Sequence, residues 1–139
     1  MKNLTLKLAI FLMVLPALTS LAQKSVTNQS DDINTPIIAA LSAGNAVELS
    51  RYFNSMVDLG IAGNEDTYSQ TQATRIVQDF FNKNKVKSMK INKQGTSNDG
   101  SKFSIGEMNA GGKVFRVYYL LKKVSGQFLI QQLQIQEEA

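Results

Sequence analysis

The sequence predicts an α+β domain in which N-terminal helices pack on one face of a curled antiparallel meander sheet. Three observations support this fold class. Apolar residues recur at helical spacing within residues 33–84, alternating apolar and polar residues dominate residues 86–137, and glycine-containing turns divide this second part into short segments. Because the strands follow one another in the chain, we expect neighbouring strands to form hairpins.

The chain begins with a segment typical of a secretory signal peptide. Lys2 and Lys7 precede or flank an apolar run over residues 8–18, and the small residues Ser20 and Ala22 stand where a signal peptidase accepts them. The apolar run is shorter than the roughly 20 residues of a membrane-spanning helix. We therefore expect cleavage after Ala22 and an exported protein, periplasmic or secreted, without a transmembrane anchor.

The mature chain is expected to contain one domain. Residues 1–22 form the predicted signal peptide, and the polar stretch 23–32 lacks periodicity and is predicted to be a flexible leader. Residues 33–139 form the predicted domain. The chain has no cysteine, so its fold depends on an apolar core without disulfides, and export without cysteine is typical of a bacterial periplasm.

The first predicted elements of the domain are two helices and a short strand. Apolar residues within 33–41 recur at helical spacing, and Gly44–Asn45 ends that helix and caps a second helix over 46–53. The alternation of residues 57–61 predicts a short strand, and residues 62–66 are predicted to be a loop.

A longer helix with a clear start signal follows. Ser69 as N-cap and Gln72 three residues later match a capping box. The apolar stripe behind this box consists of Ala73, Ile76, Val77 and Phe80. This pattern predicts an amphipathic helix that ends near Asn84.

Four strands are predicted after this helix. Their ranges are 86–94, 101–109, 113–123 and 127–137, and the turns between them are Asn98-Asp99-Gly100, Ala110-Gly111-Gly112 and Ser125-Gly126. Two-residue turns at Gly111–Gly112 and Ser125–Gly126 would set the register of the last three strands. The predicted cross-strand neighbours are Glu107 and Arg116, Ile105 and Tyr118, Phe103 and Leu120, Leu133 and Tyr118, and Gln131 and Leu120.

Charge is unevenly distributed along the chain. The formal net charge is +4, but residues 23–81 hold three basic and seven acidic residues, whereas residues 82–139 hold ten basic and four acidic ones. Five lysines lie between positions 83 and 93. We expect them to complement the C-terminal dipole of the preceding helix and to solvate the next strand, and the alternative is a patch for an anionic ligand. No aromatic residue is interleaved among them, so nucleic acid is not an expected partner.

The residue types present restrict the chemistry of any site. The chain has no histidine and no cysteine, which removes the commonest general base, the commonest metal ligands and the usual partners of a nucleophile. We therefore expect no catalytic set, no metal site and no cofactor. Aspartate, glutamate, tyrosine and lysine could still act as acids or bases if burial shifted their pKa values, so an enzyme stays open as an alternative.

Several segments carry a resemblance to a known family. The segments are GNAVELSRYF, VDLGI, YSQTQATRIVQDFF, SIGEM, FRVYYLLKK and LIQQLQI. Over about residues 31–137 the chain resembles a family of small exported proteins of unknown function from Bacteroidota. The order of its elements is similar to the cone-shaped, cystatin-like fold of the nuclear-transport-factor-two-like and ketosteroid-isomerase-like superfamily. The resemblance implies this fold, and it carries no catalytic residue over to this chain.

The predicted register divides the side chains of the sheet between two faces. The first face collects Phe103, Ile105, Leu120, Leu129, Leu133 and Ile135 around Tyr118, Gln131, Glu107 and Arg116. The second face collects Met108, Phe115, Val117, Tyr119, Leu121, Phe128 and Ile130, with Gln132 and Gln134. We expect the first face to be concave and to meet the helices.

On that assignment a binding pocket is expected in the cone. Its candidate lining residues are Arg116, Glu107, Tyr118 and Gln131, with Tyr68 from the start of the long helix. The alternative for Glu107 and Arg116 is a salt bridge at the rim that contributes under about 1 kcal/mol.

The function favoured by these observations is a non-enzymatic, cell-envelope module that binds a small molecule or a partner protein through the cone mouth or the sheet. The alternative is a small isomerase- or dehydratase-type enzyme that uses carboxylate or tyrosine groups in the cone. A buried carboxylate without an ion-pair partner would favour the enzyme, and a cone filled by side chains would favour binding at the outer surface. A homodimer through the outer sheet face is also expected, with Phe115, Val117, Tyr119 and Ile130 paired across a twofold axis.

Overall fold

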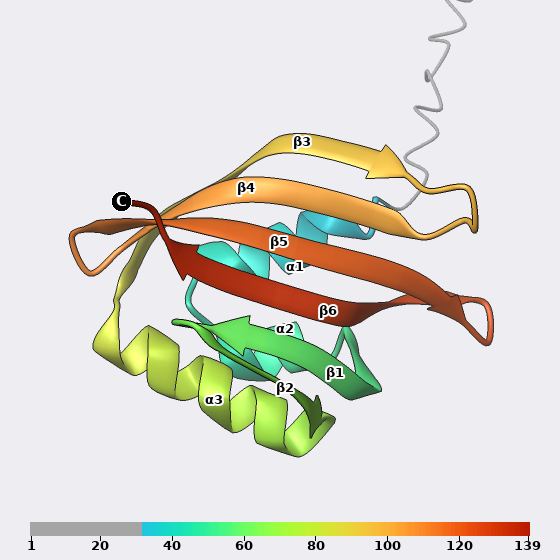
Figure 1. Cartoon of the computed structure of the whole chain (residues 1–139), viewed down its shortest axis with the longest axis horizontal. Helices are drawn as coiled ribbons and strands as arrows, with labels where there is room; N and C mark the ends of the chain where they lie inside the picture. The colour runs from blue at the N-terminus through green and yellow to red at the C-terminus, as the bar shows by residue number, and fades with distance from the viewer. Residues whose placement is uncertain (1–31) are drawn as a thin grey trace, which may run out of the picture. The chain divides into compact units, whose positions relative to one another are not determined.

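The computed structural model describes residues 32–139, and Figure 1 shows the order of their elements. The predicted signal peptide and nearly all of the predicted leader lie outside these residues. The helices are α1 (Asn34–Ser42), α2 (Ala46–Ser50) and α3 (Gln70–Lys83). The strands are β1 (Phe53–Ile61), β2 (Asn64–Ser69), β3 (Val86–Thr96), β4 (Lys102–Ala110), β5 (Lys113–Val124) and β6 (Gln127–Glu137). The α+β fold class is confirmed.

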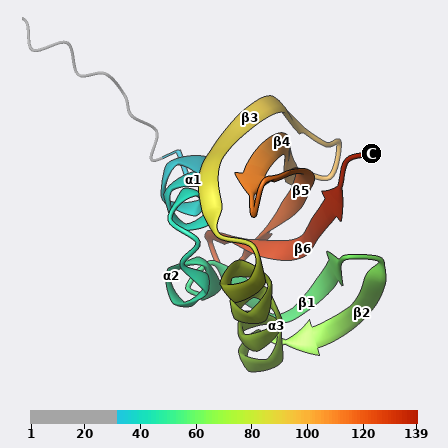
Figure 2. The same cartoon turned by 90° about the vertical axis from the view of Figure 1, so that its left-hand side faces the viewer.

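The strands form one six-stranded sheet in the order β2-β1-β6-β5-β4-β3. Every neighbouring pair is antiparallel except β1 and β6, which are parallel. The predicted meander β3-β4-β5-β6 is confirmed, and β1 extends it at the β6 side. Figure 2 shows the sheet curling, with α1 and α2 together on one side of it and α3 next to β1 and β2.

The prediction for residues 62–66 was wrong, because most of this loop belongs to a hairpin. Ala62 and Gly63 have positive φ angles of 53° and 83°, which reverse the chain, and β2 then pairs back along β1. The residues of β2 are mostly exposed at the sheet edge. An exposed edge strand has no buried face, so it lacks the apolar alternation by which a strand is recognised in a sequence.

The second helix is also shorter than predicted. It ends at Ser50, and β1 begins at Phe53, where the prediction still had helix. The backbone carbonyl of Tyr52 accepts a hydrogen bond from the amide of Ile130 on β6, at 2.6 Å. Pairing with β6 therefore takes these residues into the sheet.

The long helix α3 begins and ends as predicted. The Ser69 side chain accepts a hydrogen bond from the Gln72 amide at 3.3 Å, and the Gln72 side chain accepts one from the Ser69 amide at 3.2 Å. This reciprocal pair is a capping box. The buried residues of the helix are Ala73, Val77, Phe80 and Phe81.

The prediction of which sheet face meets the helices was wrong. The side chains that are buried against the helices include Met108, Phe115, Val117, Tyr119, Leu121 and Ile130, all of which belong to the second predicted face. The polar and charged residues of the first face, including Glu107 and Arg116, therefore lie on the outer side of the sheet. Alternation assigns side chains to two faces, but it does not say which face is covered.

A β-bulge in β6 explains a further difference. The pairs Glu107–Arg116, Ile105–Tyr118 and Phe103–Leu120 are confirmed. In β6, however, Ile130 pairs with Leu121 and Gln132 pairs with Leu120, so Gln131 is an extra residue. Leu133 consequently lies opposite Tyr119 rather than Tyr118, and both Leu133 and Ile135 face the helices with no exposed surface.

The burial pattern also corrects the residues of the expected dimer. Phe115, Val117, Tyr119 and Ile130 were predicted to pair across an outer surface, but each is at most 5% exposed within one chain. They form part of the core, so a dimer through these four side chains is excluded by their burial.

Candidate functional site

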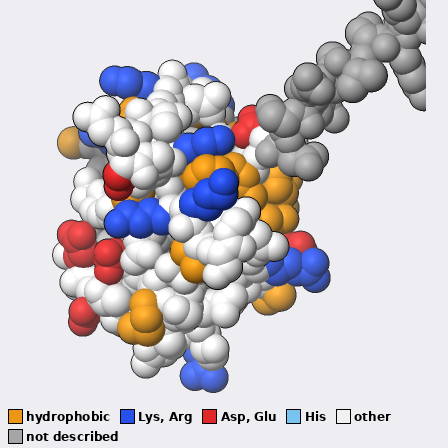
Figure 3. Space-filling model, turned by 90° about the vertical axis from the view of Figure 1, so that its right-hand side faces the viewer, with side chains coloured by type: hydrophobic (Ala, Val, Ile, Leu, Met, Phe, Trp, Pro, Cys, Tyr) orange, Lys and Arg blue, Asp and Glu red, His pale blue; other side chains and the backbone are white. Residues whose placement is uncertain are grey.

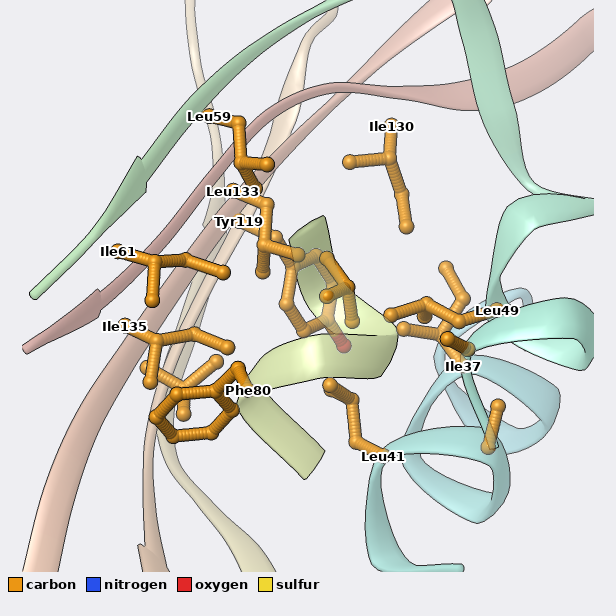
Figure 4. Close-up of a cluster of buried hydrophobic side chains, with 14 of the residues drawn as sticks. Ile37, Leu41, Leu49, Leu59, Ile61, Phe80, Tyr119, Ile130, Leu133 and Ile135 are labelled. Atoms are coloured by element: carbon orange, nitrogen blue, oxygen red, sulfur yellow. The ribbon is translucent and has the colours of Figure 1, made fainter. Parts of the chain in front are cut away.

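The space between the helices and the sheet is filled by apolar side chains (Figure 4). They come from all three helices and from β1, β5 and β6, and they include Ile37, Leu41, Leu49, Leu59, Ile61, Phe80, Tyr119, Ile130, Leu133 and Ile135. None of these is more than 8% exposed. The region in which a cone-shaped fold could hold a ligand is therefore occupied by the core of the protein itself.

One small polar cluster lies within this core. The Tyr119 hydroxyl and the Ser104 hydroxyl both donate hydrogen bonds to Oδ1 of Asn34, at 2.7 and 3.0 Å. The Asn34 amide nitrogen Nδ2 in turn donates to Asp32 at 3.0 Å and to Gln94 at 3.3 Å. Desolvation by burial raises the pKa of the Tyr119 hydroxyl, so this group stays protonated and acts as a donor.

The cluster contains no buried carboxylate, which is the feature that would favour an enzyme. Within residues 32–139 the buried polar or charged residues are Asn34, Ser101 and Ser104. No carboxylate of this part of the chain is buried in an apolar pocket. All hydrogen-bonding atoms of buried side chains in the described residues have partners, so the cluster serves to fix α1 onto β4 and β5.

A shallow depression lies on the outer face of the sheet. It has a volume of about 270 Å³ and is lined by Ile105 from β4, Arg116 and Tyr118 from β5, and Gln134 and Gln136 from β6. The antiparallel register positions these side chains, because Ile105 and Gln134 flank Tyr118, while Gln136 lies opposite Arg116. The depression thus combines a guanidinium, a phenol and two amides with the apolar side chain of Ile105.

The Arg116 side chain is not paired with Glu107, its expected partner. Glu107 lies directly opposite Arg116 in the β4–β5 ladder, as predicted. The Glu107 carboxylate instead accepts a hydrogen bond from Asn92 at 2.8 Å and lies 3.9 Å from the Lys90 ammonium. Among residues 32–139, the exposed Arg116 side chain forms no ion pair.

The other two candidate residues lie away from this depression. Gln131 is the bulge residue of β6, and its side-chain oxygen accepts a hydrogen bond from Asn54 at 2.9 Å. Tyr68, near the end of β2, packs half-buried against the core. The structure therefore brings Arg116 and Tyr118 together in the depression, with Glu107 on β4 next to Arg116, and places Gln131 and Tyr68 elsewhere.

Sequence reasoning missed Gln134 and Gln136 as lining residues. Without the bulge, the alternation of β6 assigns Gln134 to the side opposite Arg116. A signal was present, because Gln131 and Gln132 are consecutive polar residues directly before the alternating stretch 133–136. Two adjacent residues of like polarity are what an extra, bulged residue produces.

Comparison with known families assigns the chain. A family model described as "Domain of unknown function (DUF4783)" matches residues 34–136. The chain belongs to this family. The matched range begins at the first residue of α1 and ends one residue before the end of β6, so it includes all the helices and strands of residues 32–139.

Solved structures of other DUF4783 proteins support the assignment. A protein from Bacteroides ovatus is 36% identical, with a TM-score of 0.71, over 75% of this chain and 94% of that one. A protein from Bacteroides uniformis is 30% identical, with a TM-score of 0.73, over 78% of this chain and 99% of that one. The predicted resemblance to a family of unknown function is therefore confirmed.

More distant structures extend the fold assignment. An NTF2-like protein of unknown function from Cytophaga hutchinsonii has a TM-score of 0.55 at 15% identity, covering 78% of this chain and 88% of that one. This similarity supports the nuclear-transport-factor-two-like fold of the DUF4783 domain and says nothing of its activity. A comparison with curated proteins gives no match.

Proposed function

We propose that this DUF4783 protein is a non-catalytic binding module that recognises a carboxylate-bearing small molecule or protein segment on the outer face of its sheet. The observation that carries the proposal is the Arg116 guanidinium beside Tyr118, with Glu107 already held by Asn92 and Lys90. A guanidinium offers a fixed fork of donors that fits a carboxylate with two parallel hydrogen bonds.

The filled interior supports an outer site. A ligand inside the domain would have to displace fully buried side chains such as Leu41 and Leu133. Each such displacement would expose apolar surface and cost several kcal/mol, on the order of the loss seen when a large core side chain is removed. A ligand in the depression beside Tyr118 displaces only water.

Nuclear magnetic resonance can test the site directly. The chain has three arginines, so the side-chain Nε–H signals of Arg51, Arg75 and Arg116 can be assigned individually. We expect titration with succinate or with an acidic peptide to shift the Arg116 signal and the amides of Ile105 and Gln134. The control variant Arg75→Ala removes an exposed arginine from α3 and should leave these shifts unchanged. If the Ile105 and Gln134 amides shift as much in Arg116→Ala as in the wild type, the site is refuted.

The outer face could also be covered by a second copy of the chain. In that case Tyr118 and Ile105, rather than the buried residues first expected, would lie at the twofold interface. Sedimentation equilibrium at tens of micromolar distinguishes this occupant from a different partner. A dimer that Tyr118→Lys converts to a monomer would identify the second copy, whereas a monomeric wild-type protein leaves the face to another partner.

We also propose export of the protein to the periplasm or the medium. The support is the signal-peptide pattern, with its short apolar run and the small residues Ser20 and Ala22. In residues 32–139 no helix is long and apolar enough to cross a membrane. Intact-mass measurement of the protein from its native host tests this proposal, since the expected mature chain begins at Gln23. A retained Met1 would contradict it.

A further inference from the structure

A groove at one end of the sheet is separate from the Arg116 depression. It lies where β3 begins beside the β4–β5 hairpin, at the left of Figure 1, and has a volume of about 900 Å³. Its walls are formed by Lys85, Val86, Lys87 and Ser88 on one side and by Asn109, Ala110, Gly111, Gly112 and Lys113 on the other. The volume lies within the range of about 300–1,000 Å³ that is usual for small-molecule sites.

The floor of the groove is held in place by the hairpin turn and the end of α3. Gly111 and Gly112 have φ angles of 59° and 75°, which only glycine adopts readily at two successive positions. The Gly111 amide donates a hydrogen bond to the Lys85 carbonyl at 3.0 Å. A Cβ atom at Gly111 would lie 3.1 Å from Oδ1 of Asn84, so the turn rests directly on the residue that caps α3.

A β-bulge directs additional side chains toward the groove. Val86 pairs with Ala110 and Ser88 pairs with Asn109, so Lys87 is an extra residue in β3. A bulge interrupts the strict alternation of a strand and changes the direction of its side chains. Lys85, Lys87 and Ser88 consequently all border the same hollow, although an unbroken strand would send Lys87 and Ser88 to opposite faces.

The charge in the groove is positive and largely unbalanced. Of the three lysines that line it, Lys113 lies 3.2 Å from Glu137, and both side chains of this pair are about half exposed. Within residues 32–139, Lys85 and Lys87 form no ion pair. No acidic residue lines the groove. The neutral side chains of Ser88 and Asn109 are bonded to each other at 3.0 Å and retain further hydrogen-bonding capacity.

The dipole of α3 does not account for Lys87. The last turn of the helix already contains Lys83. The Phe80 carbonyl accepts two hydrogen bonds from Asn84, one from its backbone amide at 2.9 Å and one from its side chain at 3.1 Å. A helix terminus interacts favourably with charges within about one turn, so Lys87, in the following strand, has no structural role at that terminus.

We propose that this groove binds a small anion that carries two phosphate groups. Lysine ammonium groups are point charges that bind phosphate without the flat, two-pronged geometry by which arginine selects carboxylates. The lysines stand on both walls, so one phosphate group contacts Lys85 and Lys87 while a second reaches Lys113. The weak, exposed pair between Lys113 and Glu137 exchanges for this contact at little cost.

The chain contains a matched control cluster at the other end of the sheet. Lys122 and Lys123 lie at the β5–β6 hairpin. Figure 3 shows one group of basic side chains next to hydrophobic ones on this side of the molecule. The ammonium groups of Lys102 and Lys123 stand 4.6 and 6.0 Å from the centre of the Phe128 ring. Replacing Lys122 and Lys123 therefore removes the same net charge as replacing Lys85 and Lys87, at a distance from the groove.

Calorimetric titration with pyrophosphate tests the proposal. We expect saturable binding to the wild-type protein, weaker binding of inorganic phosphate, and a loss of affinity of about tenfold or more in Lys85→Gln/Lys87→Gln, because charge-assisted contacts are removed. Lys122→Gln/Lys123→Gln should stay within about twofold of the wild type, since its charges are more than a Debye length from the site. Thermal unfolding checks that each variant is folded. If Lys85→Gln/Lys87→Gln does not fold, the single variant Lys87→Gln replaces it.

Lipid vesicles distinguish the two sources of such an anion. Binding to phosphatidylcholine vesicles that contain cardiolipin, a lipid whose headgroup carries two phosphate groups, in addition to pyrophosphate binding, would assign the groove to lipid headgroups. Pyrophosphate binding alone would assign it to a soluble ligand. The proposal is overturned if neither probe binds saturably. It is also overturned if the two double variants lose affinity equally, because only net charge would then matter.

Discussion

The hydroxyl of Tyr119 on β5 donates a hydrogen bond of 2.7 Å to Oδ1 of Asn34 on α1, although 85 positions separate the two residues in the chain. Both side chains are buried. This contact joins the first helix of the domain to the centre of the sheet. Because Ser104 donates to the same oxygen, Asn34 is the acceptor for two buried hydroxyl groups.

Removing this acceptor should destabilise the domain more than removing one of its donors. We expect Asn34→Ala to lower the free energy of unfolding by at least about 2 kcal/mol, since two buried donors lose their partner, and Tyr119→Phe to lower it by about 1 kcal/mol. Tyr118→Phe is the matched control, because its ring lies on the outer face. Denaturant unfolding measures all three. Equal stability of Asn34→Ala and the wild type would show that water replaces the amide oxygen.

Tyr119 also predicts how stability depends on alkaline pH. Burial raises the pKa of its hydroxyl above the ordinary value of 10.0. In the unfolded chain the phenol ionises at about pH 10, while the folded protein keeps it protonated, so the unfolded state loses its proton first. The stability due to this group is complete below about pH 10 and declines as the pH rises through the folded pKa.

The measurement is a series of unfolding curves from pH 8 to pH 11. Lysines titrate in the same range, so the informative quantity is the difference between wild type and Tyr119→Phe. We expect the wild type to lose more stability than the variant above about pH 10. Parallel curves for the two proteins would mean that the Tyr119 hydroxyl has an ordinary pKa.

Arg116 should matter little for folding. Its side chain is exposed and forms no ion pair within residues 32–139. We expect Arg116→Ala to change the free energy of unfolding by less than about 1 kcal/mol. A loss of several kcal/mol in denaturant unfolding would identify Arg116 as a structural residue and would remove the support for the proposed binding site.

The bulge at Gln131 can be tested through its neighbours. Leu133 has no exposed surface, whereas Gln132 beside it points to the outer face opposite Leu120. We expect Leu133→Ala to cost about 2–5 kcal/mol of stability, as for other large core side chains. Gln132→Ala should stay within about 0.5 kcal/mol, as is usual for surface positions. If Gln132→Ala instead lost several kcal/mol and Leu133→Ala lost almost nothing, β6 would have the register without a bulge.

Local patterns in the sequence predicted the elements whose signals are carried by a few neighbouring residues. The capping box of Ser69 and Gln72 located the start of α3, and Asn45 capped α2 as expected. The turn at Gly111–Gly112 set the pairing of Glu107 with Arg116. These signals are reliable because hydrogen bonds within a turn or a cap form between residues close in the chain.

The candidate site was predictable only in part. The β4–β5 register, which depends on one tight turn, predicted that Arg116 and Tyr118 share one face of the sheet. That face was expected to line a pocket inside the cone, whereas the structure places both residues on the outer face. Gln134 and Gln136 were not identified, because a single extra residue at Gln131 moves every later side chain of β6 to the other face. The sequence marks that residue only by two consecutive glutamines.

The sequence by itself determined the α+β class, the order of the three helices, the meander from β3 to β6, and the absence of histidine and cysteine chemistry. The tertiary structure alone decided which face of the sheet is covered, that β2 is an edge strand, and that the interior is full. Each of these depends on contacts between distant segments, such as Asn34 with Tyr119 and Tyr52 with Ile130. Burial is a property of the packed chain, and both faces of β5 carried enough apolar residues to form a core.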